Sequence, residues 1–308
     1  MLSSILALVS VFQAATVASG QAITTLSSTQ VESFKPYTLY TAAAYCTPST
    51  TLSWSCGSNC AGNPTFQPYS SGGDGDAIQF WYTGWDPTLG SVIVAHQGTD
   101  PTQFLADLTD VNLVLGGLDP TLFPNISSSI QVHDGFADEQ AKTAQTILAA
   151  VLTLLQQYNA SSVVVTGHSL GAAIALLDSV YLQLHLPAGT RVSMVGYGMP
   201  RVGNPAFANY VDALNSSGSV PVTVTHINNK KDPVPIAVGI SLGYAHPSGE
   251  IHIQDDGSTW DACPGQDNPS PLCIVGDEPT VAQGNILDHL GPYDGILVGG
   301  IVILGLCL

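Results

Sequence analysis

The chain has 308 residues, of which 45% are hydrophobic, and its 23 acidic residues far outnumber its six basic ones. The formal net charge of −17 argues against a protein that binds nucleic acid or an anionic membrane, because both of those partners are polyanions. No internal repeat and no linker divides the chain. We therefore expect one domain over residues 21–308.

The first 20 residues have the pattern of an export signal. Residues 2–20 carry no charge, and an apolar run ends in small residues, with Ala18 and Gly20 at the −3 and −1 positions of a signal-peptidase site. The run is shorter than a membrane-spanning helix requires. We therefore expect a signal peptide over residues 1–20, a secreted extracellular protein and no transmembrane anchor.

Hydrophobic patterning predicts strands that alternate with helices. The predicted strands are residues 91–95, 162–166, 192–197 and 220–227, and the predicted helices are residues 136–158 and 170–186. This alternation predicts right-handed βαβ units and a mostly parallel sheet, which is an α/β fold. The apolar segment 295–308 is too short to span a bilayer as a helix, and we expect a buried final strand there.

The sequence Gly167-His168-Ser169-Leu170-Gly171 joins a predicted strand to a predicted helix. In this context a G-x-S-x-G motif places the serine in a sharp, strained turn, where glycines on either side avoid Cβ clashes. The helix N-terminus below it favours developing negative charge. We therefore predict that Ser169 is the nucleophile of a serine esterase.

A serine hydroxyl needs a base to accept its proton, and in this fold the acid and then the histidine follow the serine. Asp232 directly follows the predicted strand 220–227. Asp178 and Asp212 lie in presumed helices, where they are expected to be ordinary surface or capping residues. Asp232 is therefore the predicted acid.

Three histidines follow Asp232. His246 and His252 flank Glu250 in a predicted hairpin, where structural hydrogen bonds account for them. His289 lies in a turn-rich loop near the end of the chain and is the predicted base, oriented by Asp232.

The tetrahedral intermediate of ester hydrolysis needs hydrogen-bond donors for its oxyanion. The backbone N–H of Leu170, the residue after the nucleophile, is one predicted donor. Thr99 is the other, because Gly98-Thr99 follows the predicted strand 91–95 and threonine offers both an N–H and a hydroxyl. This chemistry requires no cofactor and no metal.

Six cysteines fit an oxidising compartment, but they allow 15 pairings and their spacing does not choose among these. No histidine lies at a spacing typical of a zinc site. Three N-x-S sequons, at Asn125, Asn159 and Asn215, are candidate glycosylation sites in a secreted protein.

The motifs, taken in order, resemble the fungal class 3 lipases, whose best-known members are secreted triacylglycerol lipases of filamentous fungi. The resemblance covers nearly all of residues 21–308 and is similar to the basidiomycete-like branch in particular. It is carried by AYC (44–46), HQGT (96–99), VHDGF (132–136), GHSLG (167–171), GMPRVG (198–203), DPVP (232–235) and DH (288–289).

The resemblance implies an α/β-hydrolase fold with Ser169, Asp232 and His289 as the catalytic triad and with Thr99 and Leu170 as the oxyanion hole. It also implies the disulfides Cys46–Cys307, Cys56–Cys60 and Cys263–Cys273. A short helical lid is expected at residues 101–108, where Phe104 and Leu105 would cover the acyl groove. Gln97 stands where relatives usually have arginine, and the lid segment lacks the tryptophan of many relatives.

The first hypothesis is therefore a monomeric, secreted lipase that acts on ester or lipid substrates, including those at an oil–water interface. The alternative within enzymes is a feruloyl-type or general carboxylesterase that acts on soluble esters. A third hypothesis, a catalytically inactive protein that binds lipid or wall polymer, predicts a broken triad, whereas all three positions are filled here.

Overall fold

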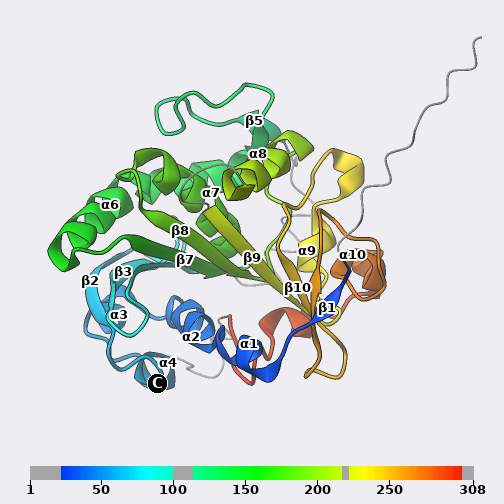
Figure 1. Cartoon of the computed structure of the whole chain (residues 1–308), viewed down its shortest axis with the longest axis horizontal. Coiled ribbons are helices and arrows are strands. Elements are labelled where there is room, and N and C mark those ends of the chain that lie inside the picture. The colour runs from blue at the N-terminus through cyan, green and yellow to red at the C-terminus, as the bar shows by residue number, and fades with distance from the viewer. Residues whose placement is uncertain (1–21, 100–113, 217–221, 300–308) are drawn as a thin grey trace, which may run out of the picture.

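A computed structural model describes residues 22–99, 114–216 and 222–299 (Figure 1). These residues form a nine-stranded central sheet with the strand order β1-β11-β10-β9-β8-β7-β4-β3-β2. The five central strands, β4, β7, β8, β9 and β10, run parallel to one another. The strands at both edges pair antiparallel. The predicted α/β fold with a mostly parallel sheet is confirmed.

The strands of the central sheet are β1 (Thr24–Thr25), β2 (Gln67–Gly72), β3 (Trp81–Asp86), β4 (Ser91–His96), β7 (Ser162–His168), β8 (Arg191–Tyr197), β9 (Val222–Asn229), β10 (Glu250–Ile253) and β11 (Trp260–Cys263). A separate ribbon pairs β5 (Leu115–Gly117) with β6 (Gln131–His133).

Helices cover the sheet on two sides (Figure 1). The long helices are α6 (Asp134–Tyr158), α7 (Leu170–His185) and α8 (Pro205–Ser216). The shorter ones are α1 (Ser28–Glu32), α2 (Lys35–Ala43), α3 (Pro48–Leu52), α4 (Gly57–Ala61), α9 (Val234–Ala237), α10 (Ile274–Asp277), η1 (Ile240–Leu242), η2 (Val281–Gln283) and η3 (Ile286–Leu290).

Each face of the sheet has its own hydrophobic core, because alternate side chains of a strand point to opposite faces. Val163 and Val165 of β7 pack with α6 and α7, whereas Val164 between them packs with Tyr40 of α2 on the other face. A strand that is buried on both faces cannot alternate with polar residues. This is why three consecutive valines, residues 163–165, stand in β7.

The helices and strands predicted from the sequence all form, with ends within two residues of the prediction. The segment 295–299 is the exception, because it contains no strand; Tyr293 and Ile296 form only an isolated bridge across a turn. Residues 300–308 of the predicted final strand lie outside the described residues. Within the described residues, no helix is long and apolar enough to cross a membrane.

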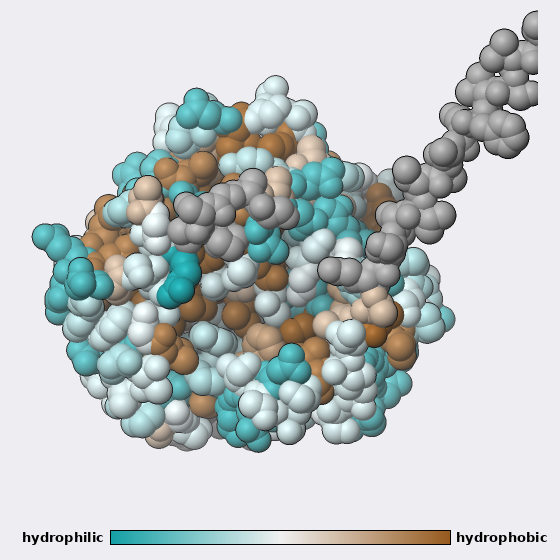
Figure 2. All heavy atoms as spheres, in the orientation of Figure 1, coloured by the Kyte–Doolittle hydropathy of each residue, from teal (hydrophilic) through white to brown (hydrophobic). Residues whose placement is uncertain are grey.

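The surface is polar but sparsely charged. Figure 2 shows mainly pale and teal residues with scattered hydrophobic ones, and only 9% of the chain is Asp, Glu, Lys or Arg. Uncharged polar residues therefore supply much of the surface polarity.

Two buried imidazoles, one of them on β9, stack on each other. The ring centroids of His226 and His246 are 4.9 Å apart, and each Nε2 bonds a backbone carbonyl, of Pro247 and Pro235 respectively. Burial lowers the pKa of His226 to about 4. Burial and the charges of His226 and Arg201 hold the pKa of His246 well below its usual range.

This pair makes the fold acid-sensitive. The unfolded state binds protons on these histidines below pH 6.5 but the folded state does not, so stability falls as the pH drops from about 6.5 towards about 4. The contribution of His226 alone is about 3 kcal/mol. We expect the double variant His226→Gln/His246→Gln, which keeps an amide donor for each carbonyl, to lose less stability than the wild type between pH 7 and pH 4.5 in urea unfolding. Equal slopes for the wild type and the double variant would contradict this account.

Candidate active site

The nucleophile candidate occupies the turn between β7 and α7. Ser169 has φ 58° and ψ −128°, a conformation that costs about 1–3 kcal/mol for a residue with a side chain. The flanking glycines are required by close packing. A Cβ on Gly167 would lie 2.2 Å from the carbonyl oxygen of Gly171, and a Cβ on Gly171 would lie 2.5 Å from that of His96. The predicted strained elbow is thus present in the structure.

Asp232 and His289 form a buried pair. Asp232 follows β9, and its Oδ1 accepts the backbone N–H of Val234 at 2.9 Å. Its Oδ2 lies 2.8 Å from Nδ1 of His289 in η3, and both residues are fully buried. Because a carboxylate only accepts, Nδ1 carries the proton and Nε2 keeps a free lone pair. His289 is thereby set up as a base at Nε2.

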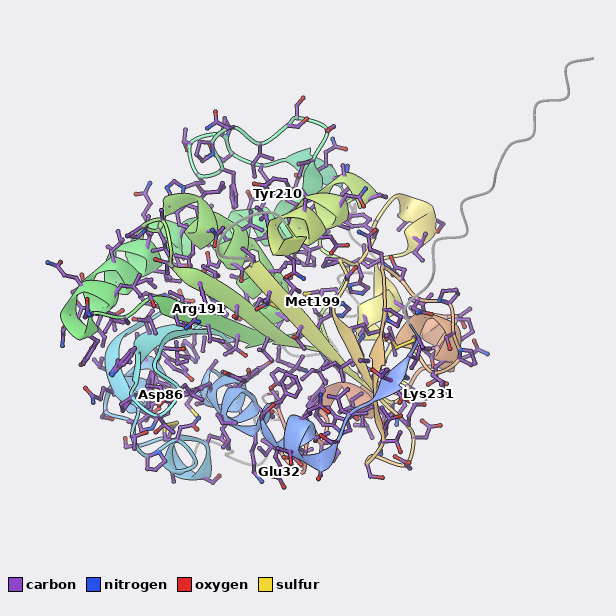
Figure 3. The ribbon with its side chains drawn as sticks, in the orientation of Figure 1. Glu32, Asp86, Arg191, Met199, Tyr210 and Lys231 are labelled. Carbon is purple, nitrogen blue, oxygen red and sulfur yellow. A yellow bond between two sulfur atoms is a disulfide. The ribbon has the colours of Figure 1, made fainter. Side chains whose placement is uncertain are left out.

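Gly198 lies where the Asp232–His289 pair packs against the backbone next to Ser169. The N–H of Ser169 donates to the carbonyl of Tyr197 at 2.9 Å, and Gly198 is the next residue. A Cβ on Gly198 would lie 2.7 Å from the His289 ring and 2.8 Å from Oδ2 of Asp232. Met199, which follows, is fully buried at the centre of the molecule (Figure 3). The absence of a side chain at position 198 therefore makes room for the Asp–His pair beside the elbow.

The hydroxyl of Ser169 and Nε2 of His289 are both buried, and neither has a hydrogen-bond partner among the described residues. A buried polar atom without a partner needs an explanation, and a catalytic role is one of them. Here one atom is a donor and the other is an acceptor. Nucleophile–base hydrogen bonds are often long without substrate and tighten in the complex.

The loop of the predicted oxyanion hole is held against the elbow. A Cβ on Gly98 would lie 2.4 Å from the carbonyl oxygen of His168 and 3.0 Å from Cβ of Ser169. Gln97 bonds Phe80 twice, through its backbone N–H and through its side-chain oxygen, each at 2.8 Å. Thr99, the last residue described before the gap, is half-buried, and Leu170 opens α7.

The prediction that Asp178 is an ordinary surface or capping residue is wrong. Asp178 is not a surface residue, because it is fully buried in α7, where it lies 2.8 Å from Nε2 of His96 and accepts the side-chain amide of Gln140 at 2.7 Å. An aspartate inside a helix as apolar as 170–186 is a signal for such partners, because unpaired carboxylates are almost never buried. Asp212 of α8 accepts hydrogen bonds from the N–H and the hydroxyl of Ser248.

The other two histidines that follow Asp232 in the sequence have structural hydrogen bonds. His246 bonds the carbonyl of Pro235, and His252 bonds those of Lys230 and Leu272. The contacts that sequence reasoning missed are those of His168, whose ring lies 4.2 Å from that of His289 and bonds its carbonyl. The sequence alone gave no signal for them, since only the fold brings residues 168 and 289 together.

Two predicted disulfides, Cys56–Cys60 and Cys263–Cys273, are present. Cys46 is also in a disulfide, but its predicted partner Cys307 lies outside the described residues. The candidate lid residues Phe104 and Leu105 lie outside them as well. The sequon asparagines Asn125, Asn159 and Asn215 are all exposed.

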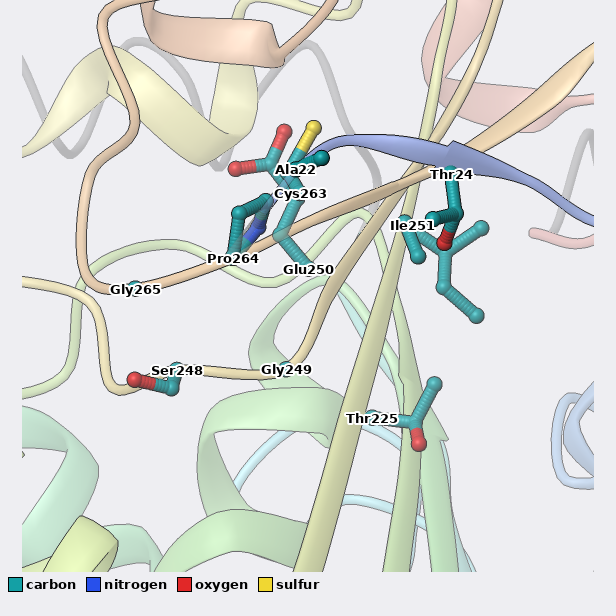
Figure 4. Close-up of a pocket in the computed structure, with 11 residues that line it drawn as sticks. Ala22, Thr24, Thr225, Ser248, Gly249, Glu250, Ile251, Cys263, Pro264 and Gly265 are labelled. Atoms are coloured by element: carbon teal, nitrogen blue, oxygen red, sulfur yellow. The ribbon is translucent and has the colours of Figure 1, made fainter. Parts of the chain in front are cut away.

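A cavity of about 660 Å³ lies between β1, β9, β10 and β11, and none of Ser169, Asp232 and His289 lines it (Figure 4). Glu250 lies there with the sulfurs of Cys263 and Cys273, and these are the only acid, histidine and cysteine groups in the described part of the chain that are spaced to hold a metal. Both sulfurs are in a disulfide, so neither is available as a thiolate ligand. The cavity therefore gives no metal site.

A mostly parallel sheet whose central strand turns through a serine into a buried helix is the α/β-hydrolase fold. The family model of the class 3 lipases matches residues 93–241. The secreted mono- and diacylglycerol lipase MDL2 of Malassezia globosa is 35% identical over 76% of this chain and 73% of its own length. The secreted mono- and diacylglycerol lipase 3 of Gibberella zeae is 32% identical over 72% and 68%.

Solved structures agree. The triacylglyceride lipase of Rhizomucor miehei matches with a TM-score of 0.76 and 26% identity over 93% of this chain and all of that one. The Lip2 lipase of Yarrowia lipolytica matches with a TM-score of 0.76 and 27% identity over 91% and 97%. The chain belongs to the class 3 lipase family, and it is a secreted carboxylic ester hydrolase.

Proposed function

We propose that this lipase hydrolyses the ester bonds of acylglycerols, triacylglycerols included, through an acyl-enzyme on Ser169. The observation that supports the proposal is that Nε2 of His289, whose Nδ1 is bonded to Asp232, and the hydroxyl of Ser169 are both buried without a partner among the described residues. One of the solved relatives, with a TM-score of 0.74, is a triacylglycerol lipase whose catalytic centre is formed by a serine protease triad.

In the proposed mechanism, Nε2 of His289 takes the hydroxyl proton as Oγ of Ser169 attacks the ester carbonyl carbon. The carbonyl oxygen becomes the oxyanion and accepts hydrogen bonds from the N–H groups of Leu170 and Thr99 and from the hydroxyl of Thr99. The buried carboxylate of Asp232 stabilises the imidazolium. The imidazolium then protonates the leaving alkoxide, and water, activated by the same imidazole, releases the fatty acid.

Substitution of Thr99 tests the oxyanion donors. Thr99→Val keeps the shape and the N–H but removes the hydroxyl. We expect kcat to fall by about 100-fold because the oxyanion loses one hydrogen-bond donor. KM and the unfolding midpoint should change little. Thr99→Ser is the matched control, because it keeps the hydroxyl and should stay close to the wild type. Equal kcat values for the valine and serine variants would show that the hydroxyl takes no part.

The substrate class is tested by comparing emulsions with a soluble ester. Relatives at 32% and 35% identity are named secreted mono- and diacylglycerol lipases, and one solved relative is named a triacylglyceride lipase. We therefore expect fatty acid release from mono-, di- and triolein emulsions and little hydrolysis of methyl ferulate. Hydrolysis of methyl ferulate without release from any emulsion would favour the feruloyl-esterase alternative.

We further propose the signal peptide at residues 1–20, a lid that includes Phe104 and Leu105, glycans on the exposed sequons and a monomer that acts at an oil–water interface. The N-terminal sequence of the secreted protein tests the signal peptide, glycopeptide mass spectrometry tests the glycans, and sedimentation tests the monomer.

A further inference from the structure

His168, the residue before the nucleophile, is fully buried and is bonded at both ring nitrogens. Its Nδ1 lies 2.7 Å from the hydroxyl of Tyr45, and its Nε2 lies 2.7 Å from the carbonyl oxygen of His289. The same carbonyl also accepts the hydroxyl of Tyr293 at 3.1 Å. The backbone of the predicted base is thus held by two buried side chains.

The chemistry of these contacts fixes the protonation of His168. A carbonyl oxygen can only accept, so Nε2 carries a hydrogen and donates it. Burial and the neighbouring charge of His289 hold the pKa of His168 well below its usual range, so the ring is neutral. Nδ1 then has only a lone pair, and the Tyr45 hydroxyl must donate to it.

We propose that Tyr45 and His168 are positioning residues for His289: the Tyr45 hydroxyl fixes the Nε2–H tautomer of His168, and that N–H holds the backbone of the base beside Ser169. This inference rests on the proposed function of His289. Tyr45 comes from the segment after α2. Its hydroxyl also packs against Gly98, where an added Cβ would lie only 2.4 Å from it. One hydroxyl therefore contacts the predicted oxyanion loop and, through His168, the predicted base.

The neutrality of His168 has a catalytic consequence. The two imidazole rings are only 4.2 Å apart, and His289 becomes positive when it takes the Ser169 proton. A second positive ring at that distance would oppose the proton transfer. By donating to Nδ1, Tyr45 occupies the atom at which His168 would otherwise be protonated.

A pair of amide variants separates the two hydrogen bonds of His168. In His168→Gln the amide lies near the position of Nε2 and can still donate to His289. In His168→Asn the amide lies near Nδ1, so it can meet Tyr45 but falls short of His289. Both variants replace the ring by a smaller side chain, so any loss of packing is common to both.

We expect His168→Asn to lower kcat by about 100-fold with KM unchanged, because a small displacement of a catalytic group costs about that factor. His168→Gln should recover kcat to within about tenfold of the wild type. Equal losses in the two variants, or wild-type activity in His168→Asn, would overturn the inference.

Nitrogen-15 NMR of the wild type gives a test that needs no altered fold. The signals that disappear in His168→Gln belong to His168, and they should report the neutral Nε2–H tautomer without titration from pH 5 to 8. An Nδ1–H tautomer, or titration in this range, overturns the inference even if His289 is the base. Full activity of His289→Ala would instead overturn the proposed function.

Discussion

Replacing Ser169 with alanine is expected to lower kcat for ester hydrolysis by about 10⁵- to 10⁶-fold, and His289→Ala should lose as much. The two side chains act as one unit, since a nucleophile without its base, or a base without its nucleophile, gives no acyl-enzyme. The double variant should therefore be no worse than either single variant. Initial rates on p-nitrophenyl esters, with a fluorophosphonate probe to report the nucleophile, provide the measurement.

The matched control for this loss is His252→Gln, which removes a fully buried imidazole that bonds two backbone carbonyls outside the site. It should keep wild-type kcat at a temperature where it is folded. Fluorophosphonate labelling of Ser169→Ala at the wild-type rate would show that another residue is the nucleophile. Full activity of His289→Ala with loss in His246→Ala would show that the base was assigned wrongly.

Gly198→Ala is expected to lower kcat by about 100-fold or more, although alanine is chemically inert. Its Cβ would lie 2.7 Å from Cε1 and Nδ1 of His289 and 2.8 Å from Oδ2 of Asp232. Neither group can retreat freely, because both are fully buried. The Asp232–His289 hydrogen bond must therefore lengthen or the imidazole must turn away from Ser169.

Gly90→Ala is the matched control for the backbone. Gly90 has φ 61° and Gly198 has φ 53°, so alanine strains both positions by about 1–2 kcal/mol. A Cβ on Gly90, however, meets nothing within 4 Å. We expect Gly90→Ala to lose only the free energy of unfolding that backbone strain costs, Gly198→Ala to lose more because of the added clash, and only Gly198→Ala to lose kcat. Unchanged kcat in Gly198→Ala would contradict a catalytic role for the Asp232–His289 pair that packs against this position.

The elements of the fold were predictable because burial leaves a pattern in the sequence. The run of valines in β7 has no polar position since both of its faces are covered, and the helix α7 that follows is apolar almost throughout for the same reason. The segment 295–299 misled the prediction because its apolar residues pack around a turn rather than along a strand. Composition indicates burial, but it does not distinguish a buried strand from a buried turn.

The candidate site was predictable where its residues are tied to local structure. Ser169 has its motif between a strand and a helix, and Asp232 follows the end of a strand. Asp178 shows the limit of this reasoning, since its partner His96 lies 82 residues away and no local pattern joins them. A buried carboxylate can be suspected from its apolar neighbours, but only the packing of α7 against β4 identifies what satisfies it.

The sequence by itself determined the strand–serine–helix elbow and the parallel sheet, because neighbouring residues give the first and hydrophobic periodicity gives the second. It also placed the candidate acid and base after the serine along the chain. Only the tertiary structure decided which atoms meet: the Asp232–His289 bond, the space that Gly198 leaves for it and the Tyr45–His168 contacts behind it. Hydrogen bonds act over about 3 Å, whereas these residues are separated by up to 244 positions along the chain (45 to 289), so their meeting depends on the whole sheet.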